Sequence, residues 1–254
     1  MNYKYIGFSK KVIESEDNLF SSTLYFNKAS EDVKSFGSNG FLTKLKNYWN
    51  EYTKNISKSG YMDQLNFTVT SLSKLKSKIT ILDIGGGYGD NYFKFRRFNQ
   101  SKLNKIEYII LEKNKRLVSL GKNFFSKEDK VFFFDKLPKK KISILVMIGT
   151  IQYIEDFFDI LGKVNFENPC YIYFSRSIFS SFLSDYFSVQ KIASQGIIEQ
   201  SIKIHSLDLF EKKMRDKNFT IIFKRKKEHL NKYFKNLESK KKINYFDILF
   251  FRKQ

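Results

Sequence analysis

The sequence of 254 residues holds one cysteine, Cys170, and two prolines, Pro138 and Pro169. A single cysteine cannot form a disulfide within one chain, so a disulfide-stapled secreted scaffold is excluded and a reducing compartment is expected. Cys170 stands in an apolar stretch, where a free cysteine commonly serves as a small core residue. Two prolines provide no Pro-rich linker that would divide the chain into separate domains.

Long apolar runs are also missing. No stretch reaches the ~18 residues that a membrane-spanning helix needs. The first residues, MNYKYIGFSKKVIESEDN, lack the apolar centre of a signal peptide. We therefore expect a cytoplasmic protein with no transmembrane segment.

Acidic residues are few beside the basic ones: 26 Asp and Glu face 46 Lys and Arg, which gives a formal charge of +20. Such a charge fits a surface for nucleic acid or anionic lipid. It also fits lysines spread over solvated faces of a chain rich in Asn, Ile, Phe and Tyr. The densest segment, residues 212–242, has 13 basic and 3 acidic residues.

Hydrophobic residues make up 42% of the chain and aromatic residues 17%, enough to build a core. From residue 78 onward, short apolar β-branched runs alternate with helical patterns, which indicates an α/β domain with a largely parallel sheet. The last two runs, FTIIFKR and YFDILFFRK, have no helical pattern between them and are expected to pair antiparallel. Residues 1–77 show helical periodicity, for example over 41–52, and predict an N-terminal helical cap on a domain that spans 78–254.

Glycine is concentrated in one place. Four glycines occupy residues 85–87 and 89, directly after the apolar run ITILDI and before the helical pattern DNYFKFRRF. Glycine turns with positive φ and lets a ligand approach the main chain. In open α/β sheets the ligand lies beyond the carboxyl ends of the strands, and the helix that follows presents free N–H groups. An acidic residue, Glu112, ends the next strand and could accept both hydroxyls of a ribose.

Two classes of nucleoside ligand use this arrangement. A dinucleotide site prefers glycine at the third position of its fingerprint, where pyrophosphate meets the helix N-terminus. Here that position is Asp90, and a second carboxylate, Asp83, ends the first strand. Carboxylates repel pyrophosphate but attract an amino group or a sulfonium, so S-adenosylmethionine is favoured over NAD.

The segments ILDIGGGYG, FFFDKLP and LVMIGTIQYIED, with Glu112 between the first two, resemble the successive cofactor motifs of class I S-adenosylmethionine-dependent methyltransferases. More narrowly, their order together with SIKIHSLDLFEKKM resembles a methyltransferase family found among bacterial cell-surface polysaccharide genes. The likeness covers about residues 78–223. It implies a Rossmann-like fold: a mostly parallel seven-stranded sheet with an antiparallel C-terminal strand.

The resemblance also implies roles for single residues. Glu112 would bind the ribose, while Asp135 would take the adenine amino group beside Leu137. The methionine part and the sulfonium would be lined by Asp83, Gly85, Gly87, Gly89, Gly149, Thr150 and Gln152. Alternatives stay open: Glu112 as a solvated strand-end carboxylate, Asp135 as the start of a turn, and Gln152 as a residue that caps and packs a helix.

Methyl transfer to a hydroxyl needs a base. His205, in SIKIHSLDLF, is a candidate because histidine titrates near neutrality, although it could instead be a packing residue. Glu155 and Asp156 are further candidates, or else carboxylates that favour the first turn of a helix. Arg176 and Asp185 are candidates for binding a polar or anionic acceptor.

These observations predict a methyltransferase that acts on oxygen of a sugar or sugar-nucleotide acceptor in surface polysaccharide biosynthesis, with S-adenosylmethionine as cofactor. The acceptor rests on the narrower resemblance. RNA is the alternative acceptor, favoured by charge but not by any recognisable RNA-binding module. Ser143 stands where many relatives have Asp, and a D/N-P-P-Y/F motif is missing, which speaks against amino methylation of nucleic acid. A non-catalytic protein that binds an adenosyl ligand is a third hypothesis.

Overall fold

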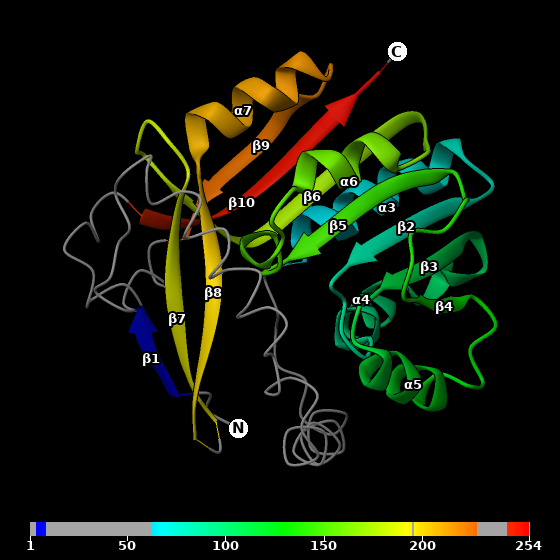
Figure 1. The fold of residues 1–254 in the computed structure, drawn as a ribbon. Helices are drawn as coiled ribbons and strands as arrows, with labels where there is room; N and C mark the ends of the chain where they lie inside the picture. Colours follow the sequence, from blue (N-terminus) through cyan, green and yellow to red (C-terminus); the bar gives the residue numbers. More distant parts are fainter. Residues whose placement is uncertain (1–3, 9–61, 195, 228–242, 254) are drawn as a thin grey trace.

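The computed structural model describes residues 4–8, 62–194, 196–227 and 243–253 (Figure 1). Its helices are α3 (Asp63–Leu75), α4 (Asp90–Phe98), α5 (Lys115–Phe124), α6 (Phe157–Lys163) and α7 (Leu207–Asp216), with short 3-10 helices η1 (Gln100–Lys105) and η2 (Ile151–Tyr153). Its strands are β1 (Lys4–Phe8), β2 (Ile79–Ile84), β3 (Ile106–Leu111), β4 (Val131–Phe134), β5 (Ile142–Ile148), β6 (Phe166–Ser180), β7 (Tyr186–Ser194), β8 (Gly196–Ser206), β9 (Thr220–Lys226) and β10 (Ile243–Arg252).

The centre of the described chain is a sheet with the order β4-β3-β2-β5-β6-β10-β9. The first five of these strands run parallel to their neighbours, whereas β10 runs antiparallel to both β6 and β9. With β1, β7 and β8 the described sheet has ten strands in place of the predicted seven. The prediction of a mostly parallel arrangement is confirmed. So is the predicted antiparallel pairing of the last two strands, which makes the sheet mixed.

The central strands are mostly apolar and buried because both faces of the sheet are covered. Every residue of β2 is buried, and β5 is buried up to its last residue. One face packs against α3, α4 and α5 through residues such as Leu65, Phe95 and Leu117. The other face packs against α6 and α7 through Phe157 and Phe210. The carboxyl ends of the parallel strands therefore remain as the place where a site can form.

A long hairpin, β7 and β8, extends from the sheet beyond the carboxyl ends of β2 and β5, with β1 along its outer edge (Figure 1). β8 joins the main sheet only at its last residues, where Phe179 of β6 pairs with His205. The sequence pattern does not predict these three strands. β7 and β8 pair with each other from Tyr186↔Ile204 to Ser194↔Gly196, outside the alternation of strands and helices in the rest of the domain.

The pattern of IQYIEDFFDILGKV, residues 151–164, predicts one helix, but the structure has η2 and then a separate helix α6 that begins after Asp156. Most of the predicted N-terminal cap, residues 9–61, lies outside the described residues. Within 1–77, α3 is helical as expected and packs into the core of the sheet, whereas β1 is a strand. No helix in the described ranges is long and apolar enough to cross a membrane.

Candidate active site at the carboxyl ends of the strands

Four neighbouring strands bring the predicted cofactor residues to one edge of the sheet. In the spatial order β4-β3-β2-β5, the residues that directly follow are Asp135, Glu112, Gly85 and Gly149. Main-chain bonds tie these ends together: Glu112 N donates to Phe134 O at 2.9 Å, and Gly85 N donates to Leu111 O at 2.8 Å. The motifs lie far apart in the sequence but form one continuous row, as an extended nucleoside ligand requires.

The glycine loop after β2 depends on left-handed backbone geometry. Gly85, Gly87 and Gly89 have φ values of 70°, 58° and 99°. A Cβ on Gly85 would lie 2.2 Å from Cγ2 of Thr150, and one on Gly89 would lie 2.6 Å from the Phe125 ring. A Cβ on Gly87 would meet no atom within 4 Å. Two glycines are therefore fixed by packing, whereas Gly87 faces open space.

Glu112 is connected to this loop. Its Oε2 accepts a hydrogen bond from Gly87 N at 3.2 Å and its Oε1 accepts one from Asn114 N at 2.9 Å. Burial raises the pKa of Glu112, and the main-chain donors partly offset that effect. A carboxylate has about four acceptor positions, so Glu112 keeps capacity for ribose hydroxyls after holding the loop.

Asp83 lies beneath the loop and is fully buried. Its Oδ2 accepts hydrogen bonds from Asn91 Nδ2 at 3.1 Å and from the Tyr108 hydroxyl at 3.0 Å. Its Oδ1 is buried without a hydrogen-bond partner. Burial raises the pKa of Asp83 to about 7, with smaller contributions from the charges of Asp90 and Glu112. Asp83 thus supports the glycine loop from below and places a carboxylate under the site.

The loop after β5 lies next to the glycine loop that follows β2. Gly149 has a φ of 64° and donates its N–H to Ser175 O at 2.8 Å. Gln152 is buried, and its Nε2 donates to Gly149 O at 2.8 Å. Thr150 contacts the glycine loop, as the close approach to Gly85 shows. Gln152 therefore holds the loop after β5 in shape.

Asp135 and Leu137 follow β4 at the end of the row. Asp135 is exposed, while Leu137 is half-buried and packs against the apolar cluster on the α6 and α7 face. An exposed carboxylate beside an apolar side chain suits the rim of an adenine site, where a polar edge and a flat apolar face are needed together.

His205 and Asp185 form a pair that the sequence did not predict. His205 Nδ1 lies 3.1 Å from Asp185 Oδ2, and Ser206 N donates to Asp185 Oδ1 at 2.8 Å. Although burial opposes it, these bonds and the nearby Lys203 lower the pKa of Asp185 to about 2. His205 is only 3% exposed; its Nε2 has no hydrogen-bond partner, and its ring packs against Phe210. Asp185, a candidate for binding the acceptor, thus holds His205 and the start of α7 through its two carboxylate oxygens.

The other candidates have distinct places. Asp156 is the N-cap of α6, where its Oδ1 accepts from Asp159 N at 2.9 Å. Glu155 is partly buried, and its carbonyl accepts a hydrogen bond from Lys203 at 3.1 Å. Arg176 is exposed on β6, one residue beyond the level at which β5 ends. Asp156 therefore has the structural role that was the alternative for it. Lys203 was missed, because nothing in its local sequence distinguishes it from other lysines.

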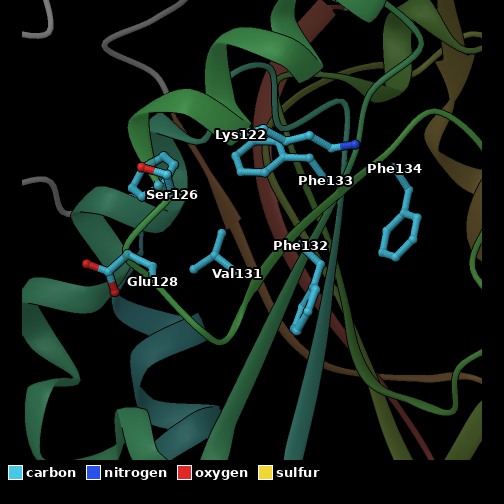
Figure 2. Close-up of a pocket in the computed structure, with 8 residues that line it drawn as sticks. Lys122, Ser126, Glu128, Val131, Phe132, Phe133 and Phe134 are labelled. Carbon is cyan, nitrogen blue, oxygen red and sulfur yellow. The ribbon is translucent and has the colours of Figure 1, made fainter.

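A pocket of about 370 Å³ lies elsewhere, along the outer edge of β4 and the C-terminal end of α5 (Figure 2). Its walls are mainly apolar and include Phe132, Phe133 and Phe134. Its acidic residue, Glu128, is bound to Arg96 and Tyr92. None of the predicted site residues lines this pocket, and it offers no convergent polar groups of the kind found at the carboxyl ends of the strands.

Comparison of the sequence with known protein families and with curated proteins finds no match. Comparison of the structure does. An S-adenosylmethionine-dependent methyltransferase from Clostridium acetobutylicum aligns with a TM-score of 0.51 and 10% identity, over 85% of this chain and 100% of that one. The glycopeptide N-methyltransferase MtfA, complexed with sinefungin, aligns with a TM-score of 0.51 and 8% identity, over 80% and 90%.

A third structure, the [4+2]-cyclase SpnF, aligns with a TM-score of 0.50 and 11% identity, over 78% of this chain and 84% of that one. At these identities the likeness establishes the fold: this chain has the Rossmann-like fold of class I S-adenosylmethionine-dependent methyltransferases. Because a cyclase shares that fold, the activity has to be argued from the site.

Proposed function

We propose that this protein binds S-adenosylmethionine at the carboxyl ends of β4, β3, β2 and β5 and transfers its methyl group to an acceptor. The observation that carries the proposal is the glycine loop after β2: Gly87 has positive φ, open space beside its Cα, and an N–H bound to the carboxylate of Glu112. In this proposal Glu112 holds the ribose, Asp135 and Leu137 hold the adenine, and the loops at Gly85 and Gly149 hold the methionine part.

Charge supports this cofactor over a dinucleotide. Asp83, Asp90 and Glu112 lie around the glycine loop, with Lys94 paired to Asp90, and negative charge on these carboxyl groups raises the cost of placing a pyrophosphate there. A ligand with an ammonium and a sulfonium gains from the same field. The cofactor supplies a methyl group already activated by sulfonium, so the protein has to position the acceptor and take up a proton.

For the acceptor, we propose a hydroxyl of a sugar or sugar nucleotide in surface polysaccharide assembly, supported by the order of motifs described above. As the new carbon–oxygen bond forms, the carbon–sulfur bond breaks with its electron pair on sulfur, and the hydroxyl proton goes to a base. We assign Nε2 of His205 as that base, because Asp185 occupies Nδ1 and Nε2 has no partner. The burial of His205 supports the alternative of a packing role, and turnover of a His205 variant distinguishes the two.

The test is equilibrium binding of S-adenosylmethionine and S-adenosylhomocysteine by calorimetry, followed by incubation of labelled cofactor with a panel of nucleotide sugars. Glu112→Ala and Gly87→Asp are expected to lower cofactor affinity at least tenfold. Asp129→Ala is the control, since Asp129 is an exposed carboxylate before β4, at the opposite edge of the sheet. Affinity that survives both site variants would show that the cofactor site is placed wrongly.

RNA as the acceptor has less support. In the described part of the basic C-terminal region, Arg225 and Lys227 both pair with the buried Asp247, and Lys224 pairs with Glu211. These cations serve the fold and are not available as a free phosphate-binding stripe. Methyl incorporation into RNA, with affinity that falls steeply as salt rises, would reverse this ranking.

A further inference from the structure

Arg176 has an unusual backbone conformation for its residue type. Its φ is 51°, in the left-handed region that glycine adopts without strain. Among the described residues only one other non-glycine has positive φ, Asn218, which follows the end of α7. Asparagine at a helix end is common in this conformation. Arginine inside a strand rarely adopts it, so the conformation of Arg176 requires a structural explanation.

The cause is a bulge clamped by Asp247. Ser175 and Arg176 of β6 both lie opposite Asp247 of β10, which interrupts the register of the two strands. Asp247 is fully buried; its Oδ1 accepts hydrogen bonds from Ser175 Oγ at 2.8 Å and from Arg176 N at 3.2 Å. Its Oδ2 binds Arg225 at 2.8 Å and Lys227 at 2.7 Å. The hydrogen bonds between β6 and Asp247, together with the two ion pairs of Asp247, thus hold Arg176 in its strained conformation.

Glycine at position 176 would form the same bulge without strain. Strained residues that the surrounding structure stabilises in this way cluster at functional sites. The side chain of Arg176 is exposed, whereas its neighbours Ser175 and Ser177 are buried. This pattern indicates that the bulge serves to place the guanidinium of Arg176 at the surface.

The location of Arg176 fits the acceptor side of the site. Its carbonyl oxygen lies 3.8 Å from the position of a Cβ on Gly149, in the loop after β5. Its charge also partly offsets the burial that raises the pKa of Tyr153 in the same loop. Arg176 thus stands beside the cofactor row, on the side away from Glu112 and Asp135. A guanidinium binds phosphate oxygens in a bidentate manner.

We propose that Arg176 binds the phosphate of a nucleoside diphosphate sugar acceptor, and that Asp247 is a positioning residue that holds Arg176 in place for it. This inference rests on the proposed function and names the acceptor group recognised beside the same site. The carboxylates at the glycine loop would then bind the cationic cofactor, and the guanidinium beyond Gly149 would bind the anionic acceptor at the same edge of the sheet.

The test measures calorimetric binding of uridine diphosphate and of uridine, which differ only in the diphosphate, to the full chain with and without S-adenosylhomocysteine. Wild-type protein is expected to bind the diphosphate at least tenfold more tightly. Arg176→Gly should remove most of that preference while the melting temperature stays the same or rises. Arg176→Asn, which also tolerates positive φ, should behave like the glycine variant, and Arg176→Lys should keep part of the preference.

Two controls bound this result. Asn218→Gly relaxes the other positive-φ residue, and Lys217→Gln removes an exposed charge next to it; both should keep the wild-type preference. An unchanged preference in Arg176→Gly, or none in wild-type protein, would overturn the inference. If wild-type protein does not bind S-adenosylhomocysteine, the proposed function is refuted instead. The two failures are distinguishable because the uridine measurements are also made without that ligand.

The role of Asp247 is tested by a double-mutant comparison. Asp247→Asn keeps an acceptor for Arg176 N but loses the charge that binds Arg225 and Lys227. It should lower the preference for uridine diphosphate and lower the melting temperature. In the Arg176→Gly background the same change should lower the melting temperature less, because glycine needs no clamp. Equal effects in both backgrounds would show that Asp247 does not act through Arg176.

Discussion

The main-chain N–H of Gly87 lies 3.2 Å from Oε2 of Glu112 and joins the loop after β2 to the end of β3. This bond gives Glu112 two tasks, to hold the glycine loop and to present its remaining lone pairs to a ligand. Since β2 and β3 are neighbouring parallel strands, their carboxyl ends lie close enough for this bond to form.

Glu112→Gln is expected to weaken cofactor binding less than Glu112→Ala. The amide oxygen of glutamine can still accept from Gly87 N, but the variant lacks the charge that strengthens hydrogen bonds to ribose hydroxyls. Hydrogen bonds to charged groups contribute roughly 1.5–3 kcal/mol, so the alanine variant should lose about 10- to 100-fold in affinity. Calorimetry with S-adenosylhomocysteine measures the series, and identical affinities for all three proteins would contradict it.

Gly87→Ala and Gly89→Ala are expected to separate binding from folding. At Gly87 the new methyl group meets open space, so the variant should lose only about 1 kcal/mol of unfolding free energy to backbone strain, yet bind the cofactor poorly. At Gly89 the methyl group would lie 2.6 Å from the Phe125 ring, and the loss should reach roughly 3 kcal/mol. Urea unfolding and calorimetry report the two quantities, and equal destabilisation would contradict this geometry.

Asp83 is expected to make stability fall as pH rises. Burial raises its pKa from the ordinary value of 3.8 to about 7, so the folded state binds a proton that the unfolded state releases. The contribution of Asp83 is therefore fully favourable below pH 4 and is lost through pH 7, at roughly 1.4 kcal/mol per pH unit. The unfolding free energy of wild-type protein minus that of Asp83→Asn, measured from pH 5 to 8, should decline along this slope. A difference independent of pH would contradict the assignment.

Asp185 is expected to make stability fall as pH is lowered, the opposite of Asp83. Its pKa is lowered from 3.8 to about 2, so its contribution is fully present above pH 4 and is lost as pH falls through 2. A shift of this size corresponds to about 2 kcal/mol. The stability difference between wild-type protein and Asp185→Asn should therefore shrink as the pH is lowered from 5 to 3. A difference that grows on acidification would show that Asp185 is not held as a carboxylate.

His205→Gln is expected to lower turnover on a hydroxyl acceptor about 100-fold or more, with the KM for the acceptor nearly unchanged, because a general base contributes about 10²–10⁴ in rate. Glutamine keeps a donor that can reach Asp185, so the hairpin should stay in place. The readout is initial rate against pH and acceptor concentration. Full turnover by the variant would leave His205 as a packing residue beside Phe210.

Local sequence predicted the structure correctly where a feature depends on a single strand or loop. The apolar runs of β2 and β5 predicted buried parallel strands, and the glycines after β2 predicted a loop with left-handed backbone geometry. Helix α6 was predicted to begin too early, because the pattern did not show that Asp156 would act as its N-cap. The β7–β8 hairpin was missed altogether, since its strands are defined by pairing with each other.

By itself, the sequence determined the alternation of strands and helices, the mixed sheet, and the row of candidate cofactor residues, because periodicity and glycine placement are local properties. Only the tertiary structure decided that Asp185 lies against His205, twenty residues away in the chain, and that Asp247 of the last strand clamps the bulge at Arg176. Both contacts join segments that meet through strand order and burial. Buried carboxylates choose their partners from whatever the fold brings within hydrogen-bonding distance, and no local pattern encodes that choice.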